Sequence, residues 1–76
     1  MKRFGEKLRM LRKTHNVTMK ELAVALGISA HSYISKLENG EKDPSVEMAV
    51  KVSDFFNVSL DNLLKDDLEI DREAKP

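Results

Sequence analysis

The sequence has no cysteine, no tryptophan and no long apolar run among its 76 residues. The absence of cysteine excludes a disulfide framework and a thiolate metal site, and two histidines without cysteine partners are too few for a zinc site. No apolar run approaches the roughly 18 residues of a membrane-spanning helix, and none follows the charged N-terminus as in a signal peptide. We therefore expect a cytoplasmic protein that contacts no membrane and holds no metal or cofactor.

Charge of neither sign dominates, because 13 basic residues balance 13 acidic ones. The distribution along the chain is uneven: residues 1–42 hold nine Lys and Arg against four acids, whereas residues 43–76 hold four against nine. Such an asymmetry favours one face made for an anionic partner. A chance excess on solvated helix surfaces explains the same numbers equally well, so charge alone does not decide between the two interpretations.

Apolar residues recur with the helical period along most of the chain, and strand signals are absent, so we predict an all-α protein. The first helical segment covers residues 3–15 and carries Phe4, Leu8 and Leu11 on one face, with Lys and Arg at the other positions. Gly5 is a weak point in this helix, because glycine costs about 1 kcal/mol against alanine.

The second segment begins at Thr18, which can form a capping box with Glu21, and it ends at Gly27. The third segment runs to about Glu38, and either Ser29 or Ser32 can cap its start. These two short helices meet in a turn that contains a glycine.

The fourth segment follows the cap residue Ser45 and ends at Asn57, and the fifth follows the cap residue Ser59 and holds residues 60–64. We expect the buried side of the fourth segment to consist of Val46, Ala49, Val50, Val52, Ser53 and Phe56.

The chain is expected to fold as one domain over residues 1–66, followed by a charged tail over residues 67–76. We expect fraying from Lys65 onward, unless Leu68 and Ile70 find a partner surface.

Two short helices joined by a turn with glycine are the signature of a helix-turn-helix. The joint here is Leu26-Gly27-Ile28-Ser29. Glycine lets the chain reverse direction within one turn, so that the second helix stands clear of the body. Such a helix fits the major groove of DNA, which is about 12 Å wide. We predict that a DNA-reading helix lies within residues 30–37.

Short motifs at matching positions extend this pattern from about residue 4 to residue 64. They are Phe4-Gly5, Leu8 with Leu11-Arg12, Leu22-Ala23, Leu26-Gly27, the string Tyr-Ile-Ser-Lys-Leu-Glu-Asn-Gly at 33–40, Pro44-Ser45, and Val58-Ser59-Leu60 with Leu63-Leu64. In these residues the chain resembles the Xre-type helix-turn-helix proteins, which include the lambdoid phage Cro proteins and repressors. The resemblance implies a compact five-helix lambda-repressor-like domain that binds operator DNA as a two-fold dimer.

The resemblance also implies an ion pair between Arg12 and Glu38 that braces the first helix against the end of the third; the alternative is two independent surface charges, worth at most about 1 kcal/mol. Two departures from the family pattern stand out. The stretch from Gly27 to Gly40 is one residue longer than the common form, so either the turn is extended or the reading helix begins one residue later. Met19 occupies a position where the family often has a glutamine that steadies a phosphate.

The expected base-reading positions are the exposed ones of the third helix: Ala30, His31, Ser32, Tyr33, Ser35 and Lys36. Lys36 can donate to guanine O6 and N7, and Ser32 can donate or accept. Tyr33 either contacts DNA or is half-buried against the second helix. The expected phosphate-binding positions flank this helix: Thr18, Met19, Lys20, Asn39 and Lys42. Because methionine cannot replace the family's glutamine, Lys20 or the Thr18 hydroxyl would take its part.

Phe56 matches a core position of the family, so Phe55 should be exposed. With Leu60 and Leu64 it could form a dimer surface; the alternative is a phenylalanine that lies against its own helix.

The sequence therefore predicts a transcription regulator, a repressor that binds a palindromic operator in double-stranded DNA as a homodimer. The alternative is the antitoxin of a toxin–antitoxin pair, which binds a protein partner and its own promoter. Either protein can be controlled by a partner, a toxin or an anti-repressor. No nucleophile–base pair, phosphate loop or metal-ligand spacing is present, so we expect no enzyme.

Overall fold

The computed structural model describes residues 3–68, which form five α-helices and no strand. The helices are α1 (Phe4–Thr14), α2 (Met19–Ala25), α3 (Ser32–Glu38), α4 (Val46–Phe56) and α5 (Leu60–Leu64). The predicted all-α, five-helix fold is confirmed. None of these helices is both long and apolar enough to cross a bilayer.

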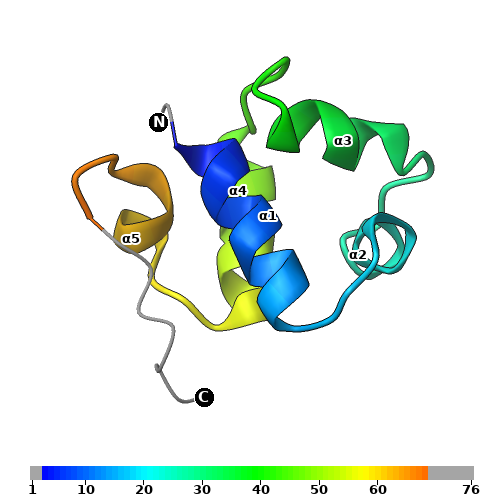
Figure 1. Ribbon diagram of the computed structural model, residues 1–76, viewed down its shortest axis with the longest axis horizontal. Helices are drawn as coiled ribbons and strands as arrows, with labels where there is room; N and C mark the ends of the chain where they lie inside the picture. The colour runs from blue at the N-terminus through cyan, green and yellow to red at the C-terminus, as the bar shows by residue number, and fades with distance from the viewer. Residues whose placement is uncertain (1–2, 69–76) are drawn as a thin grey trace.

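Helix α1 lies at the centre of the fold, in front of α4, with α5 on one side and α2 and α3 on the other (Figure 1). It packs against both α3 and α5, while α2 packs against α3 and α4 against α5. The core consists of twelve buried apolar side chains, which come from all five helices and from Leu26 at the end of α2: Phe4, Leu8, Leu11, Leu22, Ala23, Leu26, Ile34, Leu37, Ala49, Val52, Phe56 and Leu63.

Three helices begin at the side-chain caps that the sequence predicts. The hydroxyl oxygens of Thr18, Ser45 and Ser59 each accept a hydrogen bond from the backbone N–H three residues on, and Glu21 completes the capping box at Thr18. Each such cap stabilises its helix by about 1 kcal/mol. The caps therefore set where these helices begin, independently of what the helices pack against.

The ends of α1 to α4 share one geometry. A residue with positive φ follows each helix, namely Asn16, Gly27, Gly40 and Asn57. The next N–H then reaches back five residues to a carbonyl, as in the bond from Ile28 to Ala23 at 2.8 Å. This closure satisfies carbonyls that the helix end leaves without partners. The predicted ends at Gly27 and Asn57 lie where the sequence placed them.

The buried side of α4 is narrower than predicted. Ala49, Val52 and Phe56 are buried, but Val46 is 79% exposed and Val50 is 39% exposed. Successive residues of a helix are about 100° apart, so Val46 and Val50 lie well to one side of the stripe centred on the buried three. The prediction for these two valines was wrong, and they belong to the outward face of α4.

The C-terminal end of α5 is held by Lys7 of α1 and by Arg3, the residue before α1. The ammonium of Lys7 donates to the backbone carbonyls of Asn62 and Lys65, at 2.6 and 2.7 Å, and Lys7 is only 2% exposed. The backbone N–H of Arg3 donates to the Asp66 carboxylate at 2.9 Å. The expected fraying from Lys65 onward is thus wrong for the start of this segment, because α1 ties it down. Residues 69–76, with Ile70, lie outside the described part of the chain.

Replacing Lys7 by methionine should lower the free energy of unfolding by about 2 kcal/mol. Methionine keeps the apolar stem but removes a charged donor from two carbonyls, and a hydrogen bond to a charged group contributes about 1.5–3 kcal/mol. Urea denaturation measures the change. Lys13→Met on the same helix is the matched control, because Lys13 is exposed; it should change stability by less than about 0.5 kcal/mol. Equal effects of the two changes would contradict the role given to Lys7.

Candidate nucleic-acid interface

The connection between α2 and α3 extends beyond the hydrogen-bonded turn that ends α2. Helix α2 ends at Ala25, Gly27 takes a φ of +76°, and Ile28 is half-buried against the core. Helix α3 begins only at Ser32. The connection therefore runs over residues 26–31.

Neither serine predicted to cap α3 does so. The N-cap residue is His31, and no side chain accepts a hydrogen bond there. A backbone turn leads into the helix instead, with the N–H of Tyr33 bonded to Ala30 O at 3.2 Å and that of Ile34 to His31 O at 3.0 Å. Ala30 and His31 thus precede α3 rather than lie on it. Both are exposed turn residues at its N-terminal end.

Helix α3 buries Ile34 and Leu37 and turns its other side outward. Ser32 and Lys36 are exposed, whereas Tyr33 and Ser35 are half-buried. Tyr33 packs against the core, which agrees with the half-buried interpretation, and its contact with DNA stays a prediction.

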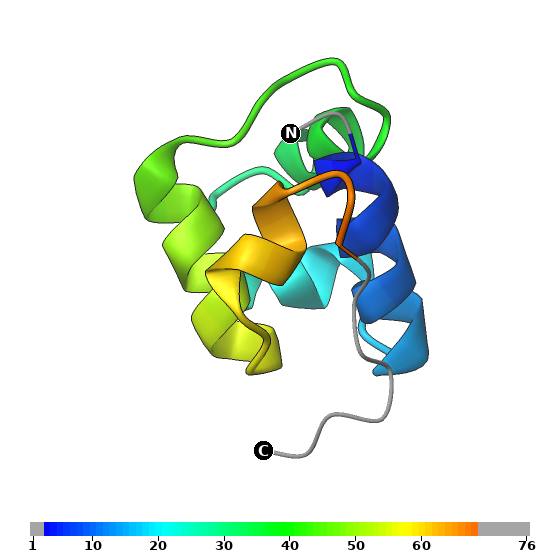
Figure 2. The ribbon, with the colours of Figure 1, turned by 90° about the vertical axis from the view of Figure 1, so that its left-hand side faces the viewer.

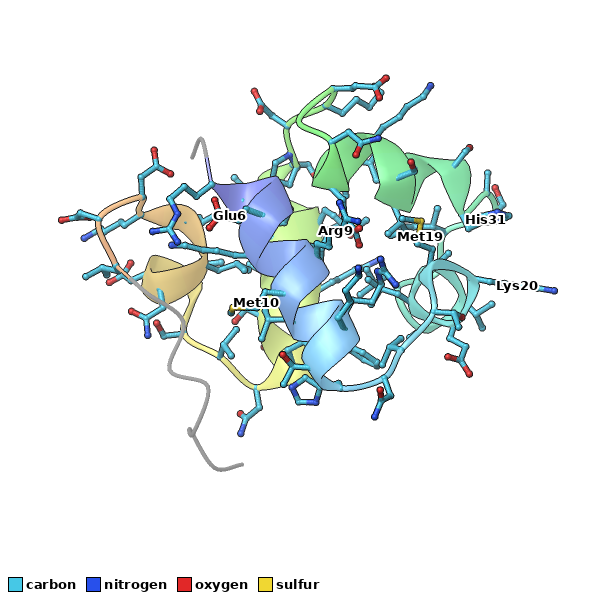
Figure 3. The ribbon with its side chains drawn as sticks, viewed as in Figure 1. Glu6, Arg9, Met10, Met19, Lys20 and His31 are labelled. Carbon is cyan, nitrogen blue, oxygen red and sulfur yellow. The ribbon has the colours of Figure 1, made fainter. Side chains whose placement is uncertain are left out.

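The residues predicted to contact phosphate flank α3 but differ in what their side chains can offer. Lys20 is exposed and projects outward on the side of the molecule that carries α2, α3 and His31 (Figure 3). Thr18 is exposed and its oxygen accepts from Glu21 N–H at 3.0 Å, which leaves its O–H free to donate. Met19 packs against the core.

Asn39 and Lys42 lie in the loop beyond the C-terminal end of α3, and both are exposed. The Asn39 side-chain amide is 3.4 Å from the Ser35 hydroxyl. The N–H groups of Glu41 and Lys42 both bond to the carbonyl of Lys36, at 2.9 and 3.3 Å. The loop is therefore folded back on the last turn of α3, and it presents Lys42 beside the helix.

Exposed charges of both signs occur in both halves of the described chain. Before α4 the exposed basic side chains are Arg9, Lys13, Lys20, Lys36 and Lys42, and the exposed acids are Glu6, Glu21, Glu41 and Asp43. On α4 and α5 the exposed acids are Glu47, Asp54 and Asp61, against Lys51. The half that carries α2 and α3 is therefore only slightly the more basic one, and attraction of a phosphate backbone would come from its individual lysines.

Helix α3 is fixed to α1 by an ion pair that is almost fully buried. Arg12 Nε lies 2.6 Å from Glu38 Oε2, and Arg12 Nη2 lies 3.1 Å from Glu38 Oε1. The side chains are 11% and 1% exposed. Arg12 Nη1 also donates to the carbonyl of Val17 at 3.2 Å. The guanidinium therefore joins α1, the loop before α2 and the end of α3.

The hydrogen bond that Arg12 donates to the Glu38 carboxylate raises the pKa of Arg12, burial lowers it, and the negative charge of Glu38 raises it further. The ion pair thus favours the charged form of the Arg12 guanidinium.

Gly5 also lies at the contact between α1 and the end of α3, a role that the sequence did not predict. A Cβ atom at this position would lie 2.3 Å from the carbonyl oxygen of Leu37 and 2.6 Å from that of Glu38. The backbone of α1 therefore touches the backbone at the end of α3, and only glycine permits this approach. Gly5 is a packing requirement and not merely a weak point of α1.

The three residues predicted for a dimer surface lie in different surroundings. Phe55 is 44% exposed, with its ring edge-on to Phe56 at 4.9 Å between centroids. Leu60 and Leu64 are half-buried and pack against the core. Phe55 lines a shallow hollow together with the C-terminal end of α2.

Comparison with known proteins gives consistent results. The family model described as helix-turn-helix matches residues 8–63. An uncharacterized HTH-type transcriptional regulator of Methanocaldococcus jannaschii is 39% identical over 57 residues, which cover 75% of this chain and 85% of that protein. The transcriptional repressor RstR of the cryptic phage CTXphi in Vibrio cholerae is 41% identical over 58 residues, 76% of this chain and 51% of RstR. The antitoxin PezA of Streptococcus pneumoniae is 38% identical over 63 residues, 83% of this chain and 39% of PezA.

Among solved structures, the N-terminal DNA binding domain of SinR from Bacillus subtilis superposes with a TM-score of 0.78 at 31% identity, covering 91% of this chain and 100% of that domain. The chain spans about half of RstR and less than half of PezA, so it corresponds to one part of those proteins. The match over residues 8–63 and the shared five-helix fold show that the chain belongs to the Xre-type helix-turn-helix family.

Proposed function

We propose that the chain is a sequence-specific regulator of transcription that reads double-stranded DNA with α3 and its preceding turn. One observation carries this proposal. Helix α3 is fixed to α1 by the Arg12–Glu38 pair and to α2 by packing, yet Ser32 and Lys36 face solvent. A rigid helix with polar outer side chains and basic neighbours can enter the major groove without refolding.

The contacts divide into two kinds. Ser32, Lys36 and the turn residues Ala30 and His31 would lie against base edges, with the exposed side of Tyr33 and Ser35 next to them. The Thr18 hydroxyl, Lys20, Asn39 and Lys42 would hold phosphates on either side, while Met19 serves only to seat the start of α2. Repression is the mode that the relationship to RstR favours.

We further propose binding as a dimer to a palindromic operator. Two reading helices in a two-fold dimer enter half-sites about 34 Å apart, one turn of DNA. Selection of DNA from a random pool with the purified protein would give the half-site, its symmetry and its spacing. Enrichment of no sequence above background would contradict the proposal.

Ser32→Ala combined with Lys36→Ala should weaken binding to the selected site by at least about tenfold and leave the melting temperature almost unchanged. Loss of one good contact to a base edge costs about 1–3 kcal/mol, and both side chains are exposed in the free protein. Fluorescence anisotropy on the selected duplex and on a scrambled one measures the change. The ratio between the two affinities should fall.

Two single variants separate the roles. Lys42→Ala should weaken binding to both duplexes alike, and it should reduce the slope of log affinity against log salt concentration by about one. Lys65→Ala removes an exposed lysine at the end of α5 and should change neither affinity. An unfolded double variant, or an unchanged affinity ratio, would show that the outward side of α3 is assigned wrongly.

The second candidate function is that of an antitoxin, which the 38% identity to PezA favours. The two functions are compatible in one chain. Co-expression of the chain with the product of the adjacent gene, both without tags, followed by size-exclusion chromatography, tests this candidate. Elution as a stable stoichiometric complex would support it. Separate elution would exclude that gene product as the partner.

A further inference from the structure

The outward face of α4 has no partner within the fold. Figure 2 shows α4 at one edge of the molecule, with no other helix beyond it. Exposed residues on this face include Val50 (39%) and Phe55 (44%), with Lys51 and Asp54 between them. These apolar and charged side chains share one uncovered helix face, which makes the face a candidate interaction surface.

The order of these four residues carries the inference. An apolar residue stands at each end of the segment from Val50 to Phe55, and a charged residue lies next to each of them. The two charges, on Lys51 and Asp54, are opposite in sign. Such an arrangement is complementary to itself when two copies run antiparallel. In a two-fold contact the same patch serves both partners, so self-complementarity is the property that it requires.

We infer that this face of α4 pairs with the same face of a second copy of the chain, which deepens the dimer part of the proposed function and rests on it. The two-fold axis passes between Lys51 and Asp54. Lys51 then lies at the level of the partner's Asp54, and Val50 at the level of the partner's Phe55. Two helices in contact are about 8–10 Å apart, a distance that a lysine and an aspartate side chain can bridge.

Two further observations agree with a second copy of the chain as the partner of this face. Among residues 3–68, neither Lys51 nor Asp54 has a salt-bridge partner, and Lys51 Nζ only approaches the carbonyl of Leu26, at 3.5 Å. Both charges are therefore available to a second molecule. A hollow of about 440 Å³ lies beside them, lined by Ala25, Leu26, Gly27, Lys51, Asp54 and Phe55, and gives a second aromatic ring room to settle.

This arrangement differs from the dimer surface predicted from the sequence. Phe55 is shared, but Leu60 and Leu64 are half-buried against the core and take no part in the inferred contact. A contact that involves one helix face is at the small end of specific interfaces, below about 1,200 Å² of total buried surface. We therefore expect a weak dimer whose population rises with protein concentration.

Charge reversal tests the pairing directly. Lys51→Asp gives a face with two acids, and Asp54→Lys gives a face with two lysines, so each variant alone should be monomeric because like charges meet across the axis. Mixed in equal amounts, the two variants should form a heterodimer, because every Asp then faces a Lys. Sedimentation velocity of the purified full chain, from low micromolar to near-millimolar concentration and without DNA, follows these states.

We expect the dimer dissociation constant to rise at least about tenfold in each single variant and to return near the wild-type value in the mixture. The double variant Lys51→Asp with Asp54→Lys should also dimerise, since it restores both pairs. Phe55→Ala should weaken the dimer, whereas Val24→Ala, which shortens another apolar side chain that is 73% exposed, should not. Circular dichroism shows whether each variant is folded.

A wild-type chain that stays monomeric over the whole range would overturn the inference, and so would single variants that dimerise like the wild type. Monomeric single variants whose mixture forms no heterodimer would also overturn it, because the reversed charges would then disrupt something other than the proposed pairs. As no DNA is present, failure here leaves the reading role of α3 untouched, and random-site selection tests that role separately.

Discussion

Replacing Glu38 by alanine should lower the free energy of unfolding by about 3–5 kcal/mol, the cost of leaving one charge of a buried pair without its partner. Arginine cannot lose its proton at any pH at which the protein folds, so the guanidinium of Arg12 would stay charged at 11% exposure with only the carbonyl of Val17 as an acceptor. A domain of this size is stable by only about 4–11 kcal/mol. We therefore expect a large fall in melting temperature, measured by circular dichroism and urea denaturation.

A double variant keeps this prediction measurable even if Glu38→Ala is largely unfolded. Replacing both partners, Arg12→Met with Glu38→Leu, removes the unpaired charge, and substitution of a buried ion pair by apolar residues of similar volume is often neutral or stabilising. The double variant should thus be much more stable than Glu38→Ala alone. A loss below about 1 kcal/mol in the single variant would mean that the pair behaves as solvated surface charges do.

The parts of the fold that the sequence predicted well are those decided by residues three to five positions apart. The caps at Thr18, Ser45 and Ser59 and the helix ends at Gly27 and Asn57 are of this kind. A hydroxyl that accepts from a backbone N–H three residues on needs no knowledge of the rest of the chain. Local signals of this type were sufficient to give the number and order of the helices.

The parts that the sequence missed depend on what lies opposite a residue in space. Nothing local shows that Lys7 reaches the carbonyls of Asn62 and Lys65, more than fifty positions away. The valines of α4 are as apolar at positions 46 and 50 as at 52, and only the direction of the core distinguishes them. In such cases the helical period indicates which apolar residues can be buried, and the packing of the helices decides which of them are buried.

The candidate interface shows both situations. Ile34 and Leu37 fix which side of α3 is buried, and so the outward position of Ser32 and Lys36 could be predicted. The start of α3 could not, because no side chain caps it and a backbone turn through Ala30 and His31 takes the place of a cap. Ala30 and His31 therefore lie in the turn before α3 and not on the helix itself.

Gly5→Ala should lower the free energy of unfolding by about 3 kcal/mol, although helix propensity alone predicts a gain of about 1 kcal/mol at this position. The new Cβ would lie 2.3 Å from Leu37 O, 2.6 Å from Glu38 O and 2.9 Å from Glu38 C. All three are backbone atoms, so no side chain can rotate away, and α1 and α3 must move apart. Overpacking of this kind typically costs about 1–3 kcal/mol, and sometimes more.

The effect should also reach the proposed reading surface, because the atoms displaced belong to the last turn of α3 and Glu38 is held there by Arg12. We expect Gly5→Ala to weaken binding to the selected duplex more than to a scrambled one, at a temperature at which the variant is folded. Arg9→Ala, one turn further along α1 at an exposed position, is the matched control and should change stability by less than about 0.5 kcal/mol. A Gly5→Ala protein as stable as the wild type would show that α1 and α3 can separate without cost, and the backbone contact between them would then not be what sets the position of the reading helix.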